Sequence, residues 1–438
     1  MDTGTVVSVL IFLTFVFLLA GIPVYIGLLM TGFFSLMALS LLTETPIATL
    51  AISQSIFNGM GNLSLLAIPF FMLAGEIMNR GGITEKLVRF AMLLIGRLPG
   101  SLANSGIIAS MFFGGITGSA QATSSCMGGI LIPAMKKEGY STSEACGVIA
   151  GASTCGPIIP PSIIMVVYAT AVGCSVGAMF MGGIIPGILC GLTLIAVVLL
   201  RNKTCKFPRR TEKLAEGELR QTVMEAIVPL GMPLIVVGGI MSGVCTVNEA
   251  GAIAVFYSLF VSLYVTKTLK MNEMGGILLN AVNSSAPILL IIACAKVFSY
   301  GLTALQMPQL VSSLILSLTD NTYVFFLLVN ILLIVMGMFM DGGAAVVILA
   351  PILAPVAVLL DISLVQFGVV MAFNLTIGNI TPPLGYCLFI TSKIGQIPVE
   401  SVVKGTAPYL IAEIGVLLLI TYIPDLITAI PLSLGYKI

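Results

Sequence analysis

The sequence predicts an all-α, polytopic membrane protein built from two inverted-topology repeats, each with a re-entrant helical hairpin and a broken helix. Three observations lead to this fold. Apolar runs of about 20 residues, the length that crosses a bilayer core of ~30 Å, recur along the whole chain. Adjacent prolines interrupt two of these runs, and a long segment of the first half recurs in the second half.

The composition supports the membrane class. Of the 438 residues, 58% are apolar and only 8% are charged, whereas about a quarter of the residues of a soluble protein are charged. The chain has no histidine, which excludes an imidazole proton relay, haem ligation by histidine and histidine-based metal sites. Its nine cysteines form no CxxC motif and lie singly in apolar segments, as small residues in helix packing do.

Hydropathy and charge together predict the topology. The first apolar run follows Met-Asp-Thr-Gly with no basic leader and no cleavage site, which favours a retained span over a signal peptide. With the N-terminus outside, 17 of the 19 basic residues fall on the inner side, as the positive-inside rule requires; the exceptions are Lys296 and Lys437. The ten expected spans cover residues 5–20, 22–42, 63–79, 142–172, 177–200, 222–242, 247–266, 278–298, 364–391 and 404–430.

Two further apolar segments, 99–135 and 322–359, fit re-entrant hairpins better than simple spans. Basic residues flank the first segment at both ends, so the chain returns to the side that it left. Its second limb, about 122–133, is too short for a crossing, and its tip is predicted in GITGSAQATSS. Residues 79–97 mix basic and apolar residues at helical spacing, which predicts a helix along the inner membrane interface.

An internal repeat relates the two halves. A shift of 222 residues aligns 115–190 with 337–412 without a gap, and 16 of the 76 positions are identical. The loop after the first hairpin reads MKKEG and its counterpart reads VLLDI, so the two loops are predicted on opposite sides and the repeats are inverted. The identities fall on residues that set backbone geometry: Gly115 with Gly337, Pro133 with Pro355, Thr154 with Thr376, Gly156 with Gly378, Pro160–Pro161 with Pro382–Pro383, Gly173 with Gly395, and Pro186 with Pro408.

Inverted repeats with interrupted helices mark secondary transporters, whose substrate and ion sites lie near the midplane.

The basic segment RNKTCKFPRRTEKLAEGELR anchors the topology and contacts lipid headgroups, an interpretation that we favour over nucleic-acid binding. Five units follow: 1–98 with first-half scaffold spans and the interfacial arm helix, 99–200 with first-half transport elements, 201–220 as a cytoplasmic linker, 221–321 with second-half scaffold spans and arm, and 322–438 with second-half transport elements.

The proline pairs predict the sites. Proline lacks an N–H and clashes with the carbonyl one turn back, so each pair frees backbone groups that hydrocarbon does not satisfy. Freed carbonyls form an oxygen cage for Na⁺, and the N-termini of half-helices hold an anionic group. We expect at least two Na⁺ sites: Gly337, Gly378, Thr381 and Leu384 in the second half, and Gly115, Gly156, Ile159 and Ser162 in the first. The predicted substrate contacts are Ser119, Thr154, Pro160, Pro161, Asn379, Pro382 and Pro383.

Asp341 is the one acidic residue deep in the second hairpin, and the repeat pairs it with Ser119. A carboxylate there is costly unless paired or bound to a cation, so we predict a role in ion coordination or coupling. The alternative is a cap on the following helix. Three other intramembrane ionisable residues have simpler readings: Glu76 pairing with Arg80, Glu249 capping a helix, and Lys296 reaching the outer interface rather than an anionic substrate.

Four segments carry a family resemblance: PFFMLAGEIMNRGGI, GGITGSAQATSSCMGGILIPAM, IIPPSIIMVVYA and GNITPPLGYCLFI. Together they resemble the large membrane (M, DctM-like) subunit of tripartite ATP-independent periplasmic (TRAP) transporters, over nearly the whole chain. One departure is the hairpin tip TGSAQATSSC, where many members carry SGSA followed by an acidic residue. In this family the two Na⁺ sites lie at the clefts between hairpin and broken helix, where the ligands named above lie.

The resemblance implies an elevator-type, Na⁺-driven importer in a bacterial inner membrane, with a periplasmic N-terminus. It also implies a small four-helix membrane subunit (Q) and a periplasmic binding protein (P), which delivers a carboxylate such as a sialic acid or a C4-dicarboxylate. The main alternative is a stand-alone Na⁺/carboxylate symporter that works without a binding protein. An intramembrane enzyme needs a nucleophile with a base or clustered acids, and ATP hydrolysis needs a Walker A motif; the sequence has neither. A channel fits two hairpins less well than a carrier does.

Overall fold

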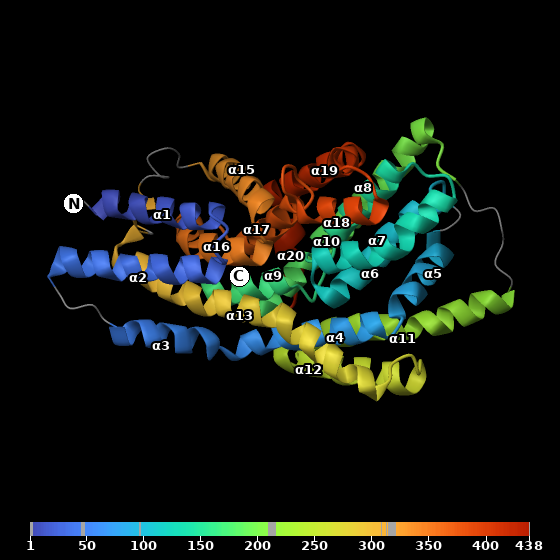
Figure 1. Cartoon of the computed structure of the whole chain (residues 1–438), viewed down its shortest axis with the longest axis horizontal. Helices are drawn as coiled ribbons and strands as arrows, with labels where there is room; N and C mark the ends of the chain where they lie inside the picture. The colour runs from blue at the N-terminus through green and yellow to red at the C-terminus, as the bar shows by residue number, and fades with distance from the viewer. Residues whose placement is uncertain are drawn as a thin grey trace.

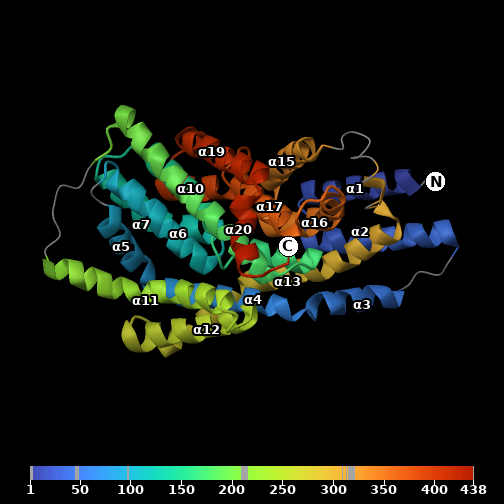
Figure 2. The same cartoon turned by 180° about the vertical axis from the view of Figure 1, so that it is seen from behind.

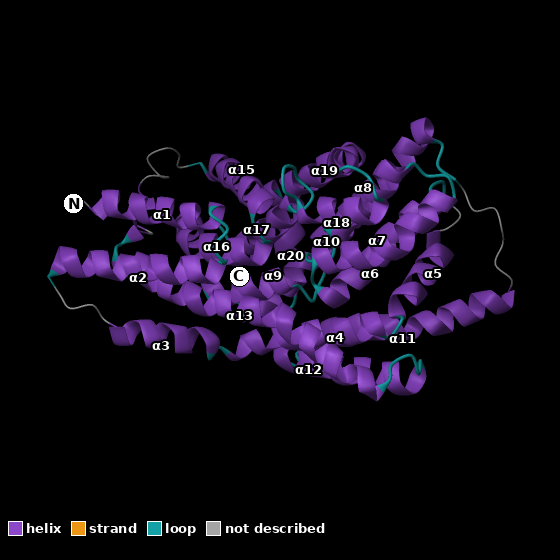
Figure 3. Cartoon of the chain, in the orientation of Figure 1, coloured by secondary structure: helices purple, strands orange, loops and turns teal. Residues whose placement is uncertain are grey.

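The structure, a computed structural model, describes residues 3–437 except 45–48, 96–97, 209–215, 308, 312 and 314–320. Helices joined by loops make up the described part of the chain, as Figure 3 shows. Residues 209–215 of the predicted cytoplasmic linker 201–220 and the flanking basic residue Arg97 lie outside the described residues. Within the described part, nine helices are long and apolar enough to cross a membrane, in agreement with a multi-pass fold.

Long helices lie side by side along the long axis of the molecule and form what we call the long-helix layer (Figures 1 and 2). Within this layer α13 packs against α2, α3 and α4, and α12 packs against α4 and α11. The layer consists of α2 (Val24–Thr43), α3 (Thr49–Met60), α4 (Ala67–Arg80), α11 (Glu216–Met241), α12 (Val247–Phe260) and α13 (Met274–Ala304). The first helix, α1 (Thr3–Leu19), packs on α2, and α5 (Ile83–Ile95) packs on α6 and α11. Short turns, η1 (Leu63–Leu66), η2 (Val261–Val265) and η3 (Met271–Glu273), flank α4, α12 and α13.

The remaining helices form a second body, the hairpin group, on one side of the long-helix layer (Figure 1). Its first half contains α6 (Ser101–Thr117), α7 (Ala120–Lys137), α8 (Thr142–Ser153), α9 (Ile163–Val172) and α10 (Val176–Cys205). Its second half contains α15 (Thr322–Phe339), α16 (Gly342–Leu359), α17 (Leu364–Gly378), α18 (Tyr386–Gly395), α19 (Val399–Tyr422) and α20 (Asp425–Ser433). The halves interlock, because α19 packs against α8 and α18 packs against α7.

Both predicted hairpins are present. In the first, α6 ends at Gly118, whose φ of 62° reverses the chain without a Cβ penalty, and Ser119 then begins α7. The expected short second limb is wrong, since α7 has 18 residues and α6 has 17. The helix α7 continues through Pro133 and the two lysines that the charge pattern placed beyond the limb.

In the second hairpin, 72% of α16 is buried inside the protein, against 28–44% for the other span-length helices, so α16 lies away from lipid.

Serine and aspartate side chains set where the helices of the hairpin group begin. A short side-chain oxygen at the N-cap accepts a hydrogen bond from a free amide of the first turn. Ser119 accepts from the amide of Ala122, and Asp341 accepts from the amide of Gly343. The same role falls to Ser141, Ser162, Ser175 and Ser363, which begin α8, α9, α10 and α17.

The two broken helices occur where the proline pairs predicted them. The predicted span 142–172 consists of α8, a non-helical segment at 154–162 and α9. The predicted span 364–391 likewise consists of α17, a segment at 379–385 and α18. We call these segments the first break and the second break.

The helix bounds follow the 222-residue shift. The shift takes α7 onto α16 at both ends, and it takes α9 onto α18 within one residue. Along the long axis of the molecule, α6 and α7 lie to one side of the centre and α15 and α16 to the other, in both views (Figures 1 and 2).

Two further features differ from the sequence prediction. The helix α3 was not expected, because its 12 residues include Ser, Gln and Asn and are too few to cross a bilayer. The last predicted span, 404–430, divides into α19 and α20 because Pro424 supplies no N–H to continue α19.

Candidate functional site

The carboxyl end of α6 packs against the first break. Gly114 and Gly156 touch through their main chains, so that a Cβ at Gly156 would lie 2.8 Å from the Cα of Gly114. Gly115 faces the other side of the break, where an added Cβ would lie 3.0 Å from Ile159 Cγ2 and 3.4 Å from the Pro160 carbonyl oxygen. Only glycine permits this approach. The structure therefore brings together three of the predicted first-half Na⁺ ligands.

The same contact occurs in the second half, between α15 and the second break. A Cβ at Gly378 would lie 2.4 Å from the carbonyl carbon of Gly337. Inside the break, the Gly378 carbonyl accepts from the Thr381 amide at 3.1 Å, and the Thr381 carbonyl accepts from the Gly385 amide at 3.2 Å. The side chain of Asn379 is 1% exposed, and its Oδ1 has no hydrogen-bond partner. A buried amide oxygen without a donor is costly, so this oxygen fits a cation that binds at the break.

The hydroxyls of both breaks hold the local backbone. Ser162 Oγ accepts from the Met165 amide at 3.3 Å and donates to the Pro157 carbonyl. Thr381 Oγ1 donates to the Ile377 carbonyl at 2.8 Å. Donation uses the hydroxyl proton and leaves oxygen lone pairs for another contact. Both hydroxyls thus retain an acceptor function at the positions where the sequence predicted Na⁺ ligands.

The two breaks differ in exposure. Pro160 and Pro161 are buried, whereas Pro382 is half-buried and Pro383 is exposed. Leu384, predicted as a carbonyl ligand, has a side chain that is 46% exposed. The first break therefore lies inside the hairpin group, and the second lies at its surface.

The tips of the two hairpins meet through side chains. Asp341 Oδ2 accepts from the Gly343 amide at 2.9 Å, which is the capping role considered from the sequence. Asp341 Oδ1 accepts from Gln121 Nε2 at 2.9 Å, and Gln121 Oε1 accepts from Ser119 Oγ at 3.1 Å. The repeat partners Ser119 and Asp341 are thus joined by Gln121, a residue that the sequence analysis missed.

A cavity of about 420 Å³ lies between these tips and the long-helix layer. The helices α4 and α13 form one wall, and residues of α6 and α7 with Asp341 form the other. Its lining carries amide, hydroxyl and carboxylate groups, as a site for a polar ligand requires. The polar lining residues are Glu76, Asn79, Thr117, Ser119, Gln121, Asn280, Ser284 and Asp341.

The carboxylates of this cavity already receive donors. Glu76 Oε1 accepts from Asn280 Nδ2 at 2.9 Å and lies 3.7 Å from Arg80 Nε, so the predicted pairing with Arg80 is present. Asn79 Oδ1 accepts from Cys126 Sγ at 2.8 Å, which leaves the Asn79 amide N–H groups for a ligand. Polar side chains of both bodies therefore face one space.

Among the predicted substrate contacts, only Ser119 lines this cavity. Thr154 is fully buried inside the hairpin group, where its hydroxyl lies 2.9 Å from Glu413 Oε1. Sequence reasoning missed Glu413, although its presence in an apolar run was a signal. It also missed Asn79 and Asn280, because single amides occur commonly in membrane helices and carry no motif.

Glu249 follows its simpler reading, whereas the reach of Lys296 to the outer interface stays a prediction. Thr246 and Glu249 form a capping box at the start of α12, where the Thr246 amide donates to Glu249 Oε2 at 2.7 Å. The stem of Lys296 packs beside Gly59 of α3, and Lys296 lines a small cavity of about 20 Å³ with Ala171 and Pro351. Lys296 is therefore outside the polar cavity at the hairpin tips.

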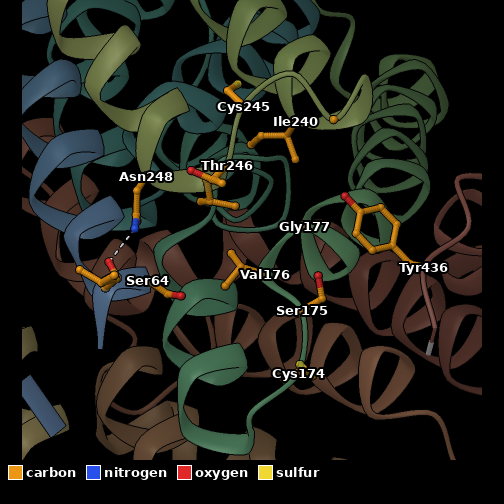
Figure 4. A pocket seen from close by; sticks show the side chains of 13 residues that line it. Ser64, Cys174, Ser175, Val176, Gly177, Ile240, Cys245, Thr246, Asn248 and Tyr436 are labelled. Carbon is orange, nitrogen blue, oxygen red and sulfur yellow. Dashed lines mark hydrogen bonds between the residues drawn. The ribbon is translucent and has the colours of Figure 1, made fainter. Parts of the chain in front are cut away.

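A second cavity, of about 570 Å³, is shown in Figure 4. It lies among the starts of η1, α10 and α12, the end of α11 and Tyr436. Asn248 Nδ2 donates to the Leu63 carbonyl across one side, at 2.7 Å. None of its 13 lining residues is charged, whereas the cavity at the hairpin tips adjoins the contact of Gln121 with Asp341 that joins the two hairpins.

Among the residues that the structure describes, no three Asp, Glu, Cys or His side chains gather as metal ligands would. The oxygens that the two breaks offer are main-chain, hydroxyl and amide oxygens, which are the hard ligands that alkali cations take.

Known proteins resemble this chain over nearly its whole length. Residues 11–426 match the family "Tripartite ATP-independent periplasmic transporter, DctM component". The C4-dicarboxylate TRAP transporter large permease protein DctM of Pseudomonas aeruginosa is 37% identical over 398 residues, which cover 91% of this chain and 93% of that one. The sialic acid TRAP transporter large permease protein SiaM of Vibrio cholerae is 37% identical over 96% of this chain and 97% of its own.

Two other comparisons bear on partners and on fold. The isethionate TRAP transporter permease protein DctMQ of Oleidesulfovibrio alaskensis is 35% identical over 93% of this chain and 64% of its own length. The solved structure of the YdaH transporter of Alcanivorax borkumensis shares the fold, with a TM-score of 0.57, 17% identity and 87% of each chain covered. The family match and the relatives agree over the hairpins and both breaks: this chain belongs to the DctM family, the large permease subunits of TRAP transporters.

Proposed function

We propose that this chain is the permease of a Na⁺-coupled uptake system for an organic anion, delivered by a periplasmic binding protein and moved by elevator-type alternating access. Membership of a permease family makes the chain a transporter subunit and not an enzyme. The observation that carries the proposal is the polar cavity of about 420 Å³ between the hairpin tips and the long-helix layer. A carrier needs its substrate site at such a boundary, so that motion of one body against the other moves the site.

Na⁺ coupling is supported by the geometry of the breaks. In the second half we assign Gly337, Gly378, Thr381 and Leu384 to one Na⁺, and in the first half Gly115, Gly156, Ile159 and Ser162 to another. The close glycine contacts hold each hairpin limb against its break, and Asn379 offers a buried, unpartnered oxygen beside the second site. Asp341 lies at the hairpin tip, where its charge favours a cation over an anion in the ion site.

The substrate class follows from the relatives and from the cavity. The names of two relatives specify C4-dicarboxylate and sialic acid, and we propose an organic anion of this kind for this chain. Amide N–H donors of Asn79 and Asn280 and the hydroxyls of Ser119 and Ser284 fit the oxygens of such a ligand. The other predicted substrate contacts do not line this cavity: Thr154, Pro160, Pro161 and Asn379 are buried inside the hairpin group, and Pro382 and Pro383 lie at the second break.

The proposed assembly has three parts in a bacterial inner membrane. A relative that unites DctM and DctQ in one chain indicates a small membrane subunit as the direct partner. The tripartite family name implies a periplasmic protein as the third part. We propose that the long-helix layer holds the small subunit and the lipid, while the N-terminus lies on the periplasmic side.

The test is uptake into proteoliposomes that contain this chain and its small membrane subunit, with carboxylates presented by the binding protein. An inward Na⁺ gradient is expected to drive accumulation, and an equal K⁺ gradient is the control. Uptake of free carboxylate without the binding protein would instead establish the stand-alone symporter. Uptake that is the same under both gradients would exclude Na⁺ coupling.

A further inference from the structure

Glu413 of α19 is a buried acidic residue that the proposed transport mechanism does not use. Its side chain is 1% exposed, and α19 packs against α8, α10, α17 and α18 around it. Oε1 contacts Thr154 Oγ1 at 2.9 Å, while Oε2 has no hydrogen-bond partner. A charged carboxylate in such a place is costly unless a cation or several donors compensate it. The surroundings of Glu413 therefore decide whether it carries a charge.

The hydrogen bonds of Thr154 indicate the protonation state. Thr154 Oγ1 lies 2.6 Å from the Gly151 carbonyl oxygen and 2.9 Å from Glu413 Oε1. The hydroxyl of Thr154 has one proton and two acceptors within reach, so it gives Glu413 at most one shared donor. A carboxylate with a single shared donor on Oε1 and a buried, unpartnered Oε2 is poorly compensated, which favours the neutral carboxylic acid.

The neighbours of Glu413 offer no charge to replace this proton. The titratable groups that face it are the thiols of Cys190 on α10 and Cys387 on α18, and Cys155 contacts Cys190 at 3.5 Å. On α8 the facing residues are Gly151 and Thr154, and α17 carries no titratable residue. Among the described residues, no Lys or Arg forms an ion pair with Glu413.

Thr154 connects this acid to the first break. It is the C-cap residue of α8, and its amide donates to the Gly151 carbonyl where the helix ends. If Glu413 lost its proton, the carboxylate would draw the Thr154 hydroxyl proton away from the Gly151 carbonyl. Loss of that bond, together with the uncompensated charge, would disturb the start of the break, which in turn holds the contact of Gly156 with Gly114.

We propose that Glu413 is a proton-binding site inside the hairpin group, and that its bound proton holds the first break in the geometry that transport needs. The effect on transport rests on the proposed function, whereas the proton site itself does not. As pH rises the proton leaves, the break is disturbed and uptake slows.

The test compares Glu413→Gln with Glu400→Gln, an identical change at an exposed position in the first turn of the same helix. Uptake is measured in proteoliposomes of the complete transporter from mildly acid to alkaline pH. Wild type and Glu400→Gln are expected to lose activity as pH rises, by up to about tenfold per pH unit once the proton is lost. Glu413→Gln keeps its activity across the range, because the glutamine amide is neutral at every pH and its oxygen accepts from Thr154 Oγ1 as Glu413 Oε1 does.

A second measurement needs no transport. The folded chain holds a proton that a solvated carboxyl group releases at neutral pH, so folded wild type binds more protons than unfolded chain and its stability falls as pH rises. Thermal unfolding of the purified chain in detergent is therefore expected to show a steeper fall of melting temperature with pH in wild type and Glu400→Gln than in Glu413→Gln. The chain has no histidine, and its cysteines and α-amino group titrate alike in all three proteins, so the difference between the curves reports Glu413.

Two outcomes overturn the proton site. One is a set of parallel pH curves for wild type and Glu413→Gln in both measurements. The other is a Glu413→Gln protein that is inactive at every pH while Glu413→Asp is active, which would show that an ionised carboxylate is required. A melting-curve difference without Na⁺-driven uptake would retain the proton site and reject the proposed function instead.

Discussion

Thr376 and Thr381 form a natural pair for testing the second ion site. Both are buried, and both hydroxyls donate to the carbonyl four residues earlier, at 2.7 Å from Thr376 and 2.8 Å from Thr381. Only Thr381 lies inside the second break, since Thr376 belongs to α17. The two valine variants therefore lose the same local hydrogen bond and differ in their distance from the proposed Na⁺.

We expect Thr381→Val to raise the Na⁺ concentration for half-maximal uptake by about tenfold, the scale set by losing one polar contact to a charged group. Thr376→Val is expected to leave that concentration within about twofold of wild type, because it removes only an internal bond. The measurement is the initial uptake rate against Na⁺ concentration. Equal curves for the two variants would remove the Thr381 hydroxyl from the ion site, while its carbonyl would remain a candidate.

At the residue scale, the sequence identified site residues that stand out locally and missed those whose role depends on distant partners or on packing. Asp341 was found because a lone acid in an apolar hairpin stands out. Gln121 was missed because its importance arises only from a partner 220 residues away. Glu413 was missed because its burial depends on how α8 and α10 pack around α19.

Helix contacts in the hairpin group depend on glycine at the crossing points. A Cβ at Gly378 would lie 2.4 Å from the main chain of Gly337, closer than atoms can approach without a backbone shift. By contrast, a Cβ at Gly129 of α7 would have no neighbour within 4 Å. Replacing glycine by alanine is thus expected to lower the stability of the chain at Gly378 and to raise it at Gly129.

We expect Gly378→Ala to lower the stability of the chain by roughly 1–3 kcal/mol, the usual cost of overpacking. Gly129→Ala is expected to raise the stability by up to about 1 kcal/mol, because alanine favours a helix over glycine. Apparent melting temperatures in detergent, with uptake rates alongside, measure both effects. An unchanged melting temperature in Gly378→Ala would mean that α15 and the second break are further apart than described.

At the element scale, the proline pairs predicted the two breaks, and the 222-residue shift relates the bounds of α7 to those of α16. Proline removes a backbone donor wherever it stands, so the breaks at 154–162 and 379–385 follow from local covalent structure. The end of α19 at Tyr422 and the short helix α3 were not anticipated. Both lie outside the repeated segments 115–190 and 337–412. Comparison with a second copy therefore could not locate these helix ends within the apolar runs.

Motion of the hairpin group against the long-helix layer is tested by a cross-link between them. Gly75 of α4 and Thr117 of α6 face each other, and a Cβ at Gly75 would lie 3.4 Å from Thr117 Cα, within reach of a disulfide. Oxidation of the Gly75→Cys, Thr117→Cys double variant is expected to stop uptake, and reduction to restore it. The measurement is uptake before and after each treatment.

A cross-link inside the hairpin group is the matched control. A Cβ at Gly395 would lie 2.4 Å from the sulfur of the native Cys146, so Gly395→Cys places two thiols together in α18 and α8. Its oxidation is expected to leave uptake near the wild-type rate, because both helices belong to one moving body. Full uptake by the cross-linked Gly75→Cys, Thr117→Cys protein would rule out the elevator motion.

For the whole molecule, the sequence by itself determined the membrane class, the two hairpins, the two breaks and the matching helix bounds of the two repeated segments. These properties follow from local composition, charge placement and proline chemistry, which act on each segment separately. Only the tertiary structure decided that Gln121 meets Asp341, that Glu413 is enclosed, and that amides of α4 and α13 share a cavity with the hairpin tips. In a membrane helix the face toward lipid is as apolar as the face toward protein, so hydrophobic periodicity does not reveal which side chains point inward.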